Sequence, residues 1–292
     1  MRTESRDSLR TWALLSPWII TLAVFWIYPL GYALFLSFTK YATLTNEMTW
    51  IGFENYERLF SDTVFWNALK NTAIFTFGTV PVTTAFAMVL AVAVRNRSPR
   101  IASFFRASFF LPSVTSLVVI ALIFMNLYSR DGYVSALCSM MGVSVPRDGW
   151  LHDSSTALPA IMAMDVWISV GYYMVLLLAG MEAIPKDLYE SAELSGASRR
   201  QQFFRITLPM LRSTLLFIVV INTIKSFQIF VEVYVMTKGG PLGATSTLVY
   251  EVYRQAFERS DSMGYASALA YVVFVILIVM SFLQMRLLRS RS

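Results

Sequence analysis

Six long apolar segments constrain the fold of this chain more than any other feature of its sequence. They run roughly from Trp12 to Phe38, Asn71 to Val94, Ala107 to Leu127, Ala157 to Met181, Pro209 to Val235 and Gly264 to Leu283. A helix needs about 20 predominantly apolar residues to cross a bilayer, and each segment is long enough. The sequence therefore predicts an all-α polytopic membrane protein with six transmembrane helices.

The composition supports a membrane protein and excludes several functions. Only 14% of the residues are charged, against about 25% in a typical soluble domain. The single cysteine, Cys138, excludes an intramolecular disulfide, and with the single histidine, His152, it argues against a zinc site. The sequence has no phosphate-binding glycine-rich loop, so ATP hydrolysis by the usual route is not expected of this chain.

Basic residues are distributed unequally between the predicted loops. With the N-terminus inside, 15 Lys and Arg residues fall on the cytoplasmic side and 8 on the outer side, while Lys225 lies within the fifth segment. Cytoplasmic loops carry the excess of Lys and Arg, so we expect both termini to face the cytoplasm. This distribution, rather than one basic patch, argues against nucleic-acid binding.

The first apolar segment is longer than the 7–15 residues of a signal-peptide apolar region. It therefore predicts a transmembrane helix that is retained in the mature protein.

The polar segment between the fourth and fifth apolar segments predicts two short helices. Pro185 suits a first helical position, and Gly196 suits a helix end. Ser198 and Gln201 form a capping-box pattern that predicts the start of the second piece. A polar, small-faced segment of this kind on the cytoplasmic side predicts a docking surface for another protein.

This segment resembles the "EAA" loop of ABC-importer membrane subunits. The family pattern is Glu-Ala-Ala, three residues, Gly, nine residues and Ile-x-Leu-Pro. The matching positions are Glu190, Ala192, Gly196, Ile206, Leu208 and Pro209. Ser191 departs from the pattern by replacing one small residue with another. The alternative is an ordinary amphipathic cytoplasmic loop.

Other segments narrow the resemblance to the carbohydrate branch of these permeases, the maltose- and glycerol-phosphate-type group. They are residues 50–56, 227–234, 238–241 and 263–268. The resemblance implies a type I ABC importer permease fold with a cytoplasmic coupling helix between helices 4 and 5. It implies a second, related permease, two cytosolic ATPases that use ATP, an extracytoplasmic solute-binding protein and no cofactor on this chain.

Three domains are expected. The first helix and outer loop span 1–68, the permease core spans 69–284, and a basic tail spans 285–292. We expect short surface helices within 41–70 and 247–253.

Two other functional classes are weighed against the importer. A membrane-embedded enzyme would need paired carboxylates, a metal cluster or an activated nucleophile, and an ion channel would need a selectivity filter. The sequence contains neither the residues that such an enzyme site would need nor a selectivity filter. An importer for a non-sugar solute remains an alternative.

Polar residues in the apolar segments are candidates for a solute path, since ionisable residues there are costly. Asn222, Lys225, Gln228 and Glu232 recur at helical spacing in the fifth segment, and Asp165 in the fourth is expected at a similar depth. The alternatives are a structural Asp165–Lys225 ion pair, a polar lining of the path, or misplaced boundaries with both groups in interfacial water. Aromatic candidates for sugar contact are Trp167, Tyr172, Phe227 and Phe230.

Overall fold

The computed structural model describes residues 2–42, 47–95, 97–259 and 262–288. Its contacts divide the chain into two compact units, residues 1–62 with 252–273 and residues 63–251 with 274–292. Within the predicted basic tail, Arg289 and Arg291 lie outside the described residues.

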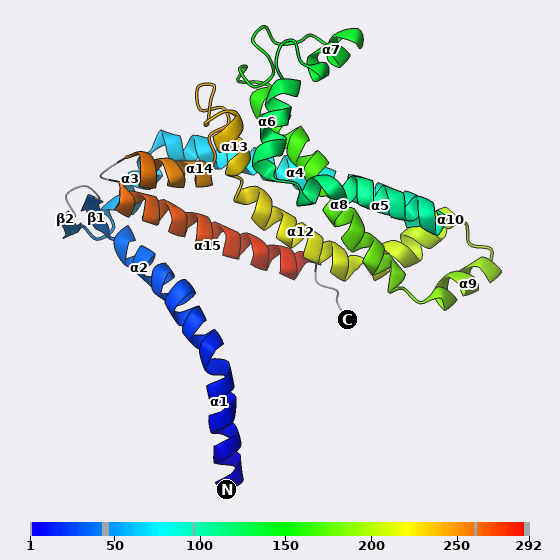
Figure 1. Cartoon of the computed structure of the whole chain (residues 1–292), viewed down its shortest axis with the longest axis horizontal. Coiled ribbons are helices and arrows are strands. Elements are labelled where there is room, and N and C mark those ends of the chain that lie inside the picture. The colour runs from blue at the N-terminus through cyan, green and yellow to red at the C-terminus, as the bar shows by residue number, and fades with distance from the viewer. Residues whose placement is uncertain (1, 43–46, 96, 260–261, 289–292) are drawn as a thin grey trace. The chain divides into compact units, whose positions relative to one another are not determined.

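The first unit begins with a long helix that is mostly exposed where its side chains are described, from residue 11 onward. The helix comprises α1 (Arg2–Leu22), a π-helical turn η1 (Ala23–Ile27) and α2 (Tyr28–Ser37) (Figure 1). Only 6% of its most apolar window is buried. Pro29 lies in the first turn of α2, where a missing N–H costs little. The predicted first transmembrane helix is therefore confirmed, and its apolar surface is available to lipid or to another subunit.

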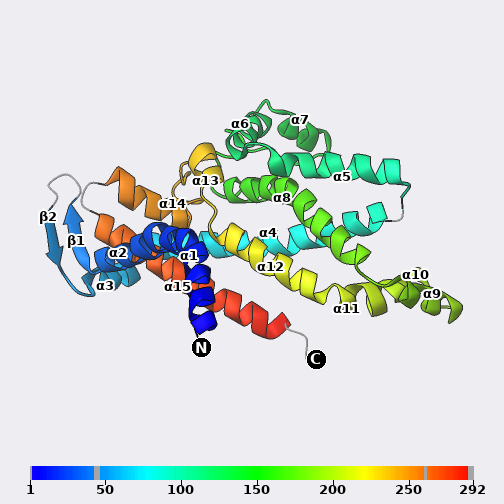
Figure 2. The same cartoon turned by 60° about the horizontal axis from the view of Figure 1, so that its bottom comes forward.

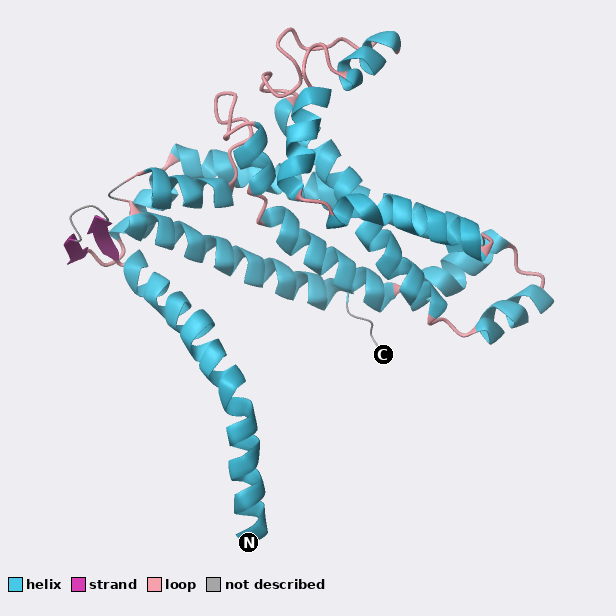
Figure 3. Ribbon diagram, in the orientation of Figure 1, coloured by secondary structure: helices cyan, strands magenta, loops and turns pink. Residues whose placement is uncertain are grey.

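A β-hairpin follows this helix and was not predicted. Strand β1 (Thr39–Ala42) pairs antiparallel with β2 (Glu47–Trp50), and the two strands are magenta in Figure 3. The helix α3 (Glu54–Ser61) confirms the expected helix in this loop. Its Asn55 side chain donates 2.9 Å hydrogen bonds to the carbonyls of Ser37 and Thr39, which joins α3 to the start of the hairpin. The first unit also contains η3 (Arg254–Glu258) and the first part of α15 (Met263–Leu288).

The second unit is built around α8 (Ala157–Glu182). This helix packs against α4 (Thr63–Arg95), α5 (Pro99–Val114) and α12 (Arg212–Phe227). In α8, 61% of the most apolar window is buried, against 33% in α4. The other elements are α6 (Leu117–Leu127), α7 (Tyr133–Met140), α9 (Lys186–Leu194), α10 (Arg199–Gln202), η2 (Phe203–Thr207), α11 (Leu208–Met210), α13 (Val231–Met236), α14 (Leu248–Tyr253) and the rest of α15. Figures 1 and 2 both place α9 and α10 at one end of this unit and α13 at the other.

The third predicted transmembrane segment is broken near Pro112, as this proline predicts, and forms two helices, α5 and α6. The chain bends by 96° between α5 and α6, so the described residues contain five helices of span length, or six if this bent pair is one span. Pro112 lies in the last turn of α5, and Thr115 then adopts an extended backbone with ψ of 150°. The break thus comes three residues after the proline.

The predicted fifth helix is also interrupted. The helix α12 ends at Phe227, and α13 begins only at Val231. The Thr247 hydroxyl donates a 3.1 Å hydrogen bond to the carbonyl of Ile229 within this break. Backbone groups away from water need such partners, so the break is tolerated because protein groups surround it. Glu232 consequently lies on a different helix from Asn222 and Lys225.

Replacement of Gly171 is expected to separate α5 from α8. A Cβ at Gly171 would lie 1.8 Å from the carbonyl oxygen of Phe109, a backbone atom that cannot rotate away. Overpacking typically costs about 1–3 kcal/mol, so Gly171→Ala should lower the thermal unfolding midpoint in detergent by several degrees. Gly31→Ala is the matched control, because a Cβ at this helical glycine meets nothing within 4 Å. Equal midpoints for the two variants would contradict the close approach.

Candidate functional site

A polar elbow, residues 185–209, connects α8 to α12. Pro185 is the N-cap of α9 rather than its first helical residue. At the other end, Gly196 has φ of +74°, a left-handed conformation that glycine adopts without strain. Its N–H donates to the carbonyl of Glu193 at 2.9 Å, and the Ala197 N–H donates to that of Ala192 at 2.9 Å. This pair of bonds is a Schellman motif, and it confirms the predicted helix end.

The second piece of the elbow begins as the sequence predicts. The Ser198 side chain accepts from the Gln201 N–H at 3.3 Å, and the Gln201 side chain accepts from the Ser198 N–H at 2.8 Å. These reciprocal bonds form a capping box at the start of α10. The chain then passes through the π-helical turn η2, and Pro209 lies in the first turn of α11. The elbow therefore contains two helical pieces with a glycine turn between them.

The helix α9 presents its side chains outward. None of its residues is buried. Glu190 is exposed, and Leu194 at the tip is 92% exposed. Ile206 packs against the buried cluster formed by α4, α8 and their neighbours, and so does Tyr189 of α9. Ala192 and Leu208 are half-buried, and Pro209 is exposed. The elbow is thus anchored through Ile206 and Tyr189, while the exposed side chains of α9 are free to contact another protein.

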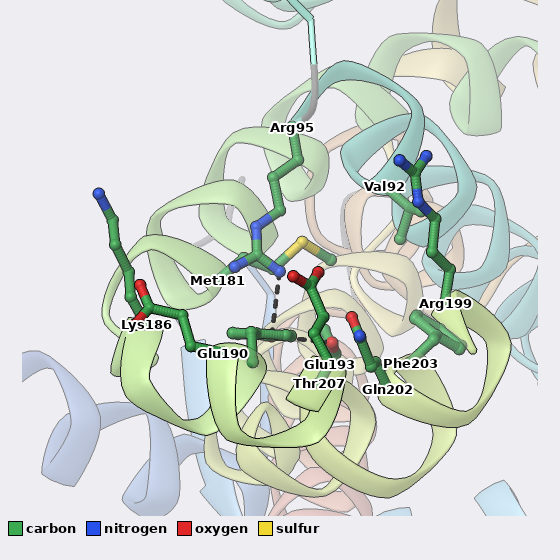
Figure 4. A pocket seen from close by; sticks show the side chains of 11 residues that line it. Val92, Arg95, Met181, Lys186, Glu190, Glu193, Arg199, Gln202, Phe203 and Thr207 are labelled. Atoms are coloured by element: carbon green, nitrogen blue, oxygen red, sulfur yellow. Dashed lines mark hydrogen bonds between the residues drawn. The ribbon is translucent and has the colours of Figure 1, made fainter. Parts of the chain in front are cut away.

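A pocket of about 660 Å³ lies between the elbow and the ends of α4 and α8. Its lining includes Arg95 and Arg199 together with Glu190 and Glu193. Figure 4 shows the Arg95 side chain reaching into this pocket, whereas the Lys186 side chain points away from its middle. The Arg95 guanidinium donates a 3.0 Å hydrogen bond to the Tyr189 hydroxyl. The pocket therefore combines charges of both signs beside the elbow.

The structure brings Asp165 and Lys225 together within the membrane segments. The Lys225 ammonium lies 3.1 Å from the Asp165 carboxylate and donates a 2.6 Å hydrogen bond to the Ser169 hydroxyl. The Asp165 side chain is 3% exposed and that of Lys225 is 45% exposed. One carboxylate oxygen of Asp165 has no hydrogen-bond partner among the described residues. The pair thus joins α8 to α12 and leaves the lysine side partly accessible.

The other candidates for a solute path divide into accessible and buried residues. Trp167 is 49% exposed and contacts Phe124 at a centroid distance of 5.4 Å. Gln228 is exposed in the break after α12. Asn222, Phe227 and Glu232 are each at most 4% exposed. In the predicted polar stripe, Lys225 and Gln228 are therefore accessible, whereas Asn222 and Glu232 are buried inside the chain. Tyr172 is exposed, and Phe230 is half-buried.

The structure adds residues that the sequence did not single out. Ser169 joins the ion pair, and its position one turn after Asp165 was an available signal because residues four apart share a helix face. Arg95 and Thr207 meet around Tyr189. No local pattern connects these three residues, since Arg95 is 94 positions away from Tyr189.

Comparisons with known proteins cover nearly the whole chain. Residues 83–291 match the family described as "Binding-protein-dependent transport system inner membrane component". The chain is 35% identical to the lactose transport system permease protein LacF of Rhizobium radiobacter, over 100% of both chains. It is also 35% identical to the probable ABC transporter permease protein YurN of Bacillus subtilis, over 98% of both chains.

A solved structure has the same fold. The crystal structure of a bacterial alginate ABC transporter, in complex with an alginate pentasaccharide-bound periplasmic protein, contains a chain that aligns with a TM-score of 0.83. The alignment covers 99% of this chain and 96% of that one, at 24% identity. At this identity the likeness establishes the fold alone.

The two partners of the ion pair are expected to respond unequally to mutation. Lys225→Met leaves a buried carboxylate unpaired, which typically costs about 3–5 kcal/mol. Asp165→Asn leaves a lysine that is 45% exposed and still hydrated, so its cost should be smaller. Thermal unfolding of the two variants in detergent should therefore show the larger decrease for Lys225→Met. The double variant should recover stability, and a midpoint below both single variants would contradict the pairing.

Proposed function

Because this chain belongs to the family of binding-protein-dependent transport system inner membrane components, we propose that it is a permease subunit through which an ATP-driven importer moves a sugar or sugar-derived solute. Full-length similarity to a lactose transport permease supports the sugar class. The exposed Trp167, with Lys225 and Gln228 as hydrogen-bond donors, supports it independently. An aromatic face suits the apolar side of a sugar ring. A non-sugar solute is the alternative within the same class.

The proposed assembly contains four kinds of component. This chain and a second, related permease form the membrane part, two cytosolic ATPases bind below them, and an extracytoplasmic binding protein delivers the solute. The exposed α9 supports an ATPase contact, because a leucine that is 92% exposed on a charged helix suits insertion into a partner surface. The exposed apolar surface of α1 and α2 leaves room for a second subunit.

The orientation follows from the same assignment. We place both termini and the elbow on the cytoplasmic side, which the 15-to-8 distribution of basic residues supports. The elbow is then within reach of cytosolic ATPases. The extracytoplasmic side holds the break between α12 and α13, where Gln228 lies.

The elbow is proposed to couple ATP hydrolysis to transport. Glu190 is the acidic contact to the ATPase, and Ala192 and Gly196 allow close seating because they carry little or no side chain. Ile206, Leu208 and Pro209 connect the seated helix to α12. ATP binding closes the ATPases, which carry α9 with them and rotate the helices so that the path opens outward. Hydrolysis returns it inward, a rigid-body transition that needs a stiff connection.

One observation carries this proposal. The helix α9 ends in a Schellman motif at Gly196, the glycine position of the matching loop pattern, and no residue of α9 is buried. Tyr189 packs against the buried cluster, and the exposed remainder of α9 is available to a protein partner. A thermal-shift screen of the solute-binding protein that we propose as a partner, carried out against sugars, would identify the solute for the assays below.

Gly196→Asp is expected to abolish transport without preventing membrane insertion. A Cβ here meets no atom within 4 Å, so the side chain causes no clash, but φ of +74° strains any residue other than glycine, and the strained turn and the new charge disturb seating on the ATPase. Uptake should fall at least about tenfold, a loss of only about 1.4 kcal/mol. The assay is uptake and stimulated ATPase activity of the reconstituted transporter.

Gly142→Asp is the matched control for this experiment. Gly142 has φ of +76° and the same open surroundings, but it lies after α7, outside the elbow. The control should retain uptake. Full ATPase stimulation in Gly196→Asp would refute the coupling role, and so would equal losses in the two variants.

The accessible part of the solute path gives a second test of function. Gln228→Ala removes an exposed amide that we propose contacts solute hydroxyls, so KM for uptake should rise about 2- to 10-fold, as expected for one hydrogen bond of about 0.5–1.5 kcal/mol. Ile221→Ala, an exposed apolar position on α12, should leave KM unchanged. An unchanged KM in Gln228→Ala, with transport intact, would place the path elsewhere.

A further inference from the structure

Three side chains from separate elements meet at Tyr189 and form a clamp. The Arg95 guanidinium donates a 3.0 Å hydrogen bond to the Tyr189 hydroxyl and lies 4.7 Å from the centre of its ring. The same hydroxyl lies 2.9 Å from the hydroxyl of Thr207. Arg95 ends α4, Tyr189 belongs to α9, and Thr207 ends η2. The clamp therefore connects the exposed helix to two other elements of the second unit.

Both outer members of the clamp are fixed to the helix bundle. Arg95 directly follows Val94, which is 4% exposed within the buried cluster around α8. Thr207 is itself 4% exposed, and its neighbour Ile206 packs against the same cluster. Tyr189 is thus held between two positions that do not move independently of the bundle, because packed interiors transmit displacement.

The rest of α9 offers little other restraint on its angle. No residue of α9 is buried, and the helix is flanked by Pro185 and by the left-handed Gly196. The 660 Å³ pocket lies beside it and is lined by Arg95, Tyr189 and Thr207 themselves. Empty volume next to a helix does not oppose its tilting, so the restraint comes from Tyr189, through its hydrogen bonds and through the packing of its ring on the buried cluster.

We propose that Arg95, Tyr189 and Thr207 are positioning residues that fix the angle of α9 and thereby transmit ATPase movement to α4 and α11. This inference rests on the proposed function, since it assumes that an ATPase seats on α9. A charge-assisted bond is among the stronger hydrogen bonds, which suits a connection that must carry force. The clamp acts through α9 and has no contact with solute.

The test uses hydroxyl removal without loss of volume. Tyr189→Phe keeps the ring and its contact with Arg95, and Thr207→Val keeps the branched shape. The complete transporter is assembled in nanodiscs with its ATPases, its second permease and the binding protein loaded with lactose, or with whichever sugar the thermal-shift screen ranks above lactose. The readouts are the amount of assembled complex, the ratio of stimulated to basal ATPase activity, and the number of solute molecules transported per ATP.

We expect normal assembly with poor coupling. Both variants should lower the stimulated-to-basal ratio at least about fivefold, the low end of typical coupling between two sites. Transport per ATP should fall in parallel. Thr207→Ser, which restores the hydroxyl, should recover the wild-type ratio. The double variant should be no worse than Tyr189→Phe alone, because that change already removes both hydrogen bonds of the hydroxyl, whereas Thr207→Val removes one of them. Tyr133→Phe on α7, where the tyrosine is 78% exposed, is the matched control.

Two outcomes would overturn the clamp. One is a wild-type ratio in both Tyr189→Phe and Thr207→Val. The other is a loss of assembled complex that accounts for all lost activity, since that indicates a purely structural role. Failure of the proposed function is distinguishable, because the wild-type transporter itself would then show no stimulation by the loaded binding protein.

Discussion

The absence of hydrogen-bond partners in lipid is the constraint on which this structure depends. Every backbone N–H and C=O in the hydrocarbon region needs a partner from the protein, which leaves helices as the way for a chain of this kind to cross. The breaks after Val114 and Phe227 depart from regular helix, and at the second of them the Thr247 hydroxyl supplies a partner to the carbonyl of Ile229. Irregular backbone therefore occurs where protein groups compensate for it.

The same constraint separates the sequence into apolar segments and a polar elbow with different sources of stability. The helix α8 is held by burial against its neighbours, with Gly171 allowing α5 to approach closely. The helix α9 has no buried residue and is shaped by local bonds, the Schellman motif at Gly196 and the capping box at Ser198. Local bonds define a helix but leave its angle open. That angle depends on side chains such as Tyr189, which reach back to the bundle.

The ion pair of Asp165 and Lys225 illustrates how polar groups are retained inside such a bundle. The carboxylate is buried, and the lysine that neutralises it remains half accessible. Transfer of an isolated charge into lipid is costly, so each partner reduces the cost of the other. Sequence spacing placed the two at a similar depth. Only packing of α8 on α12 decided that their side chains meet and that Ser169 joins them.

The sequence by itself determined the number and order of apolar segments, the helix end at Gly196 and the capping box at Ser198. These features depend on residues within a few positions of one another, through periodicity, backbone conformation and local hydrogen bonds. Tertiary structure decided the meeting of Arg95 with Tyr189, the pairing of Asp165 with Lys225 and the contact of Thr247 with the break after Phe227. Those features depend on groups far apart in the chain, whose mutual approach is set by packing, and local sequence does not encode which distant surface a helix will meet.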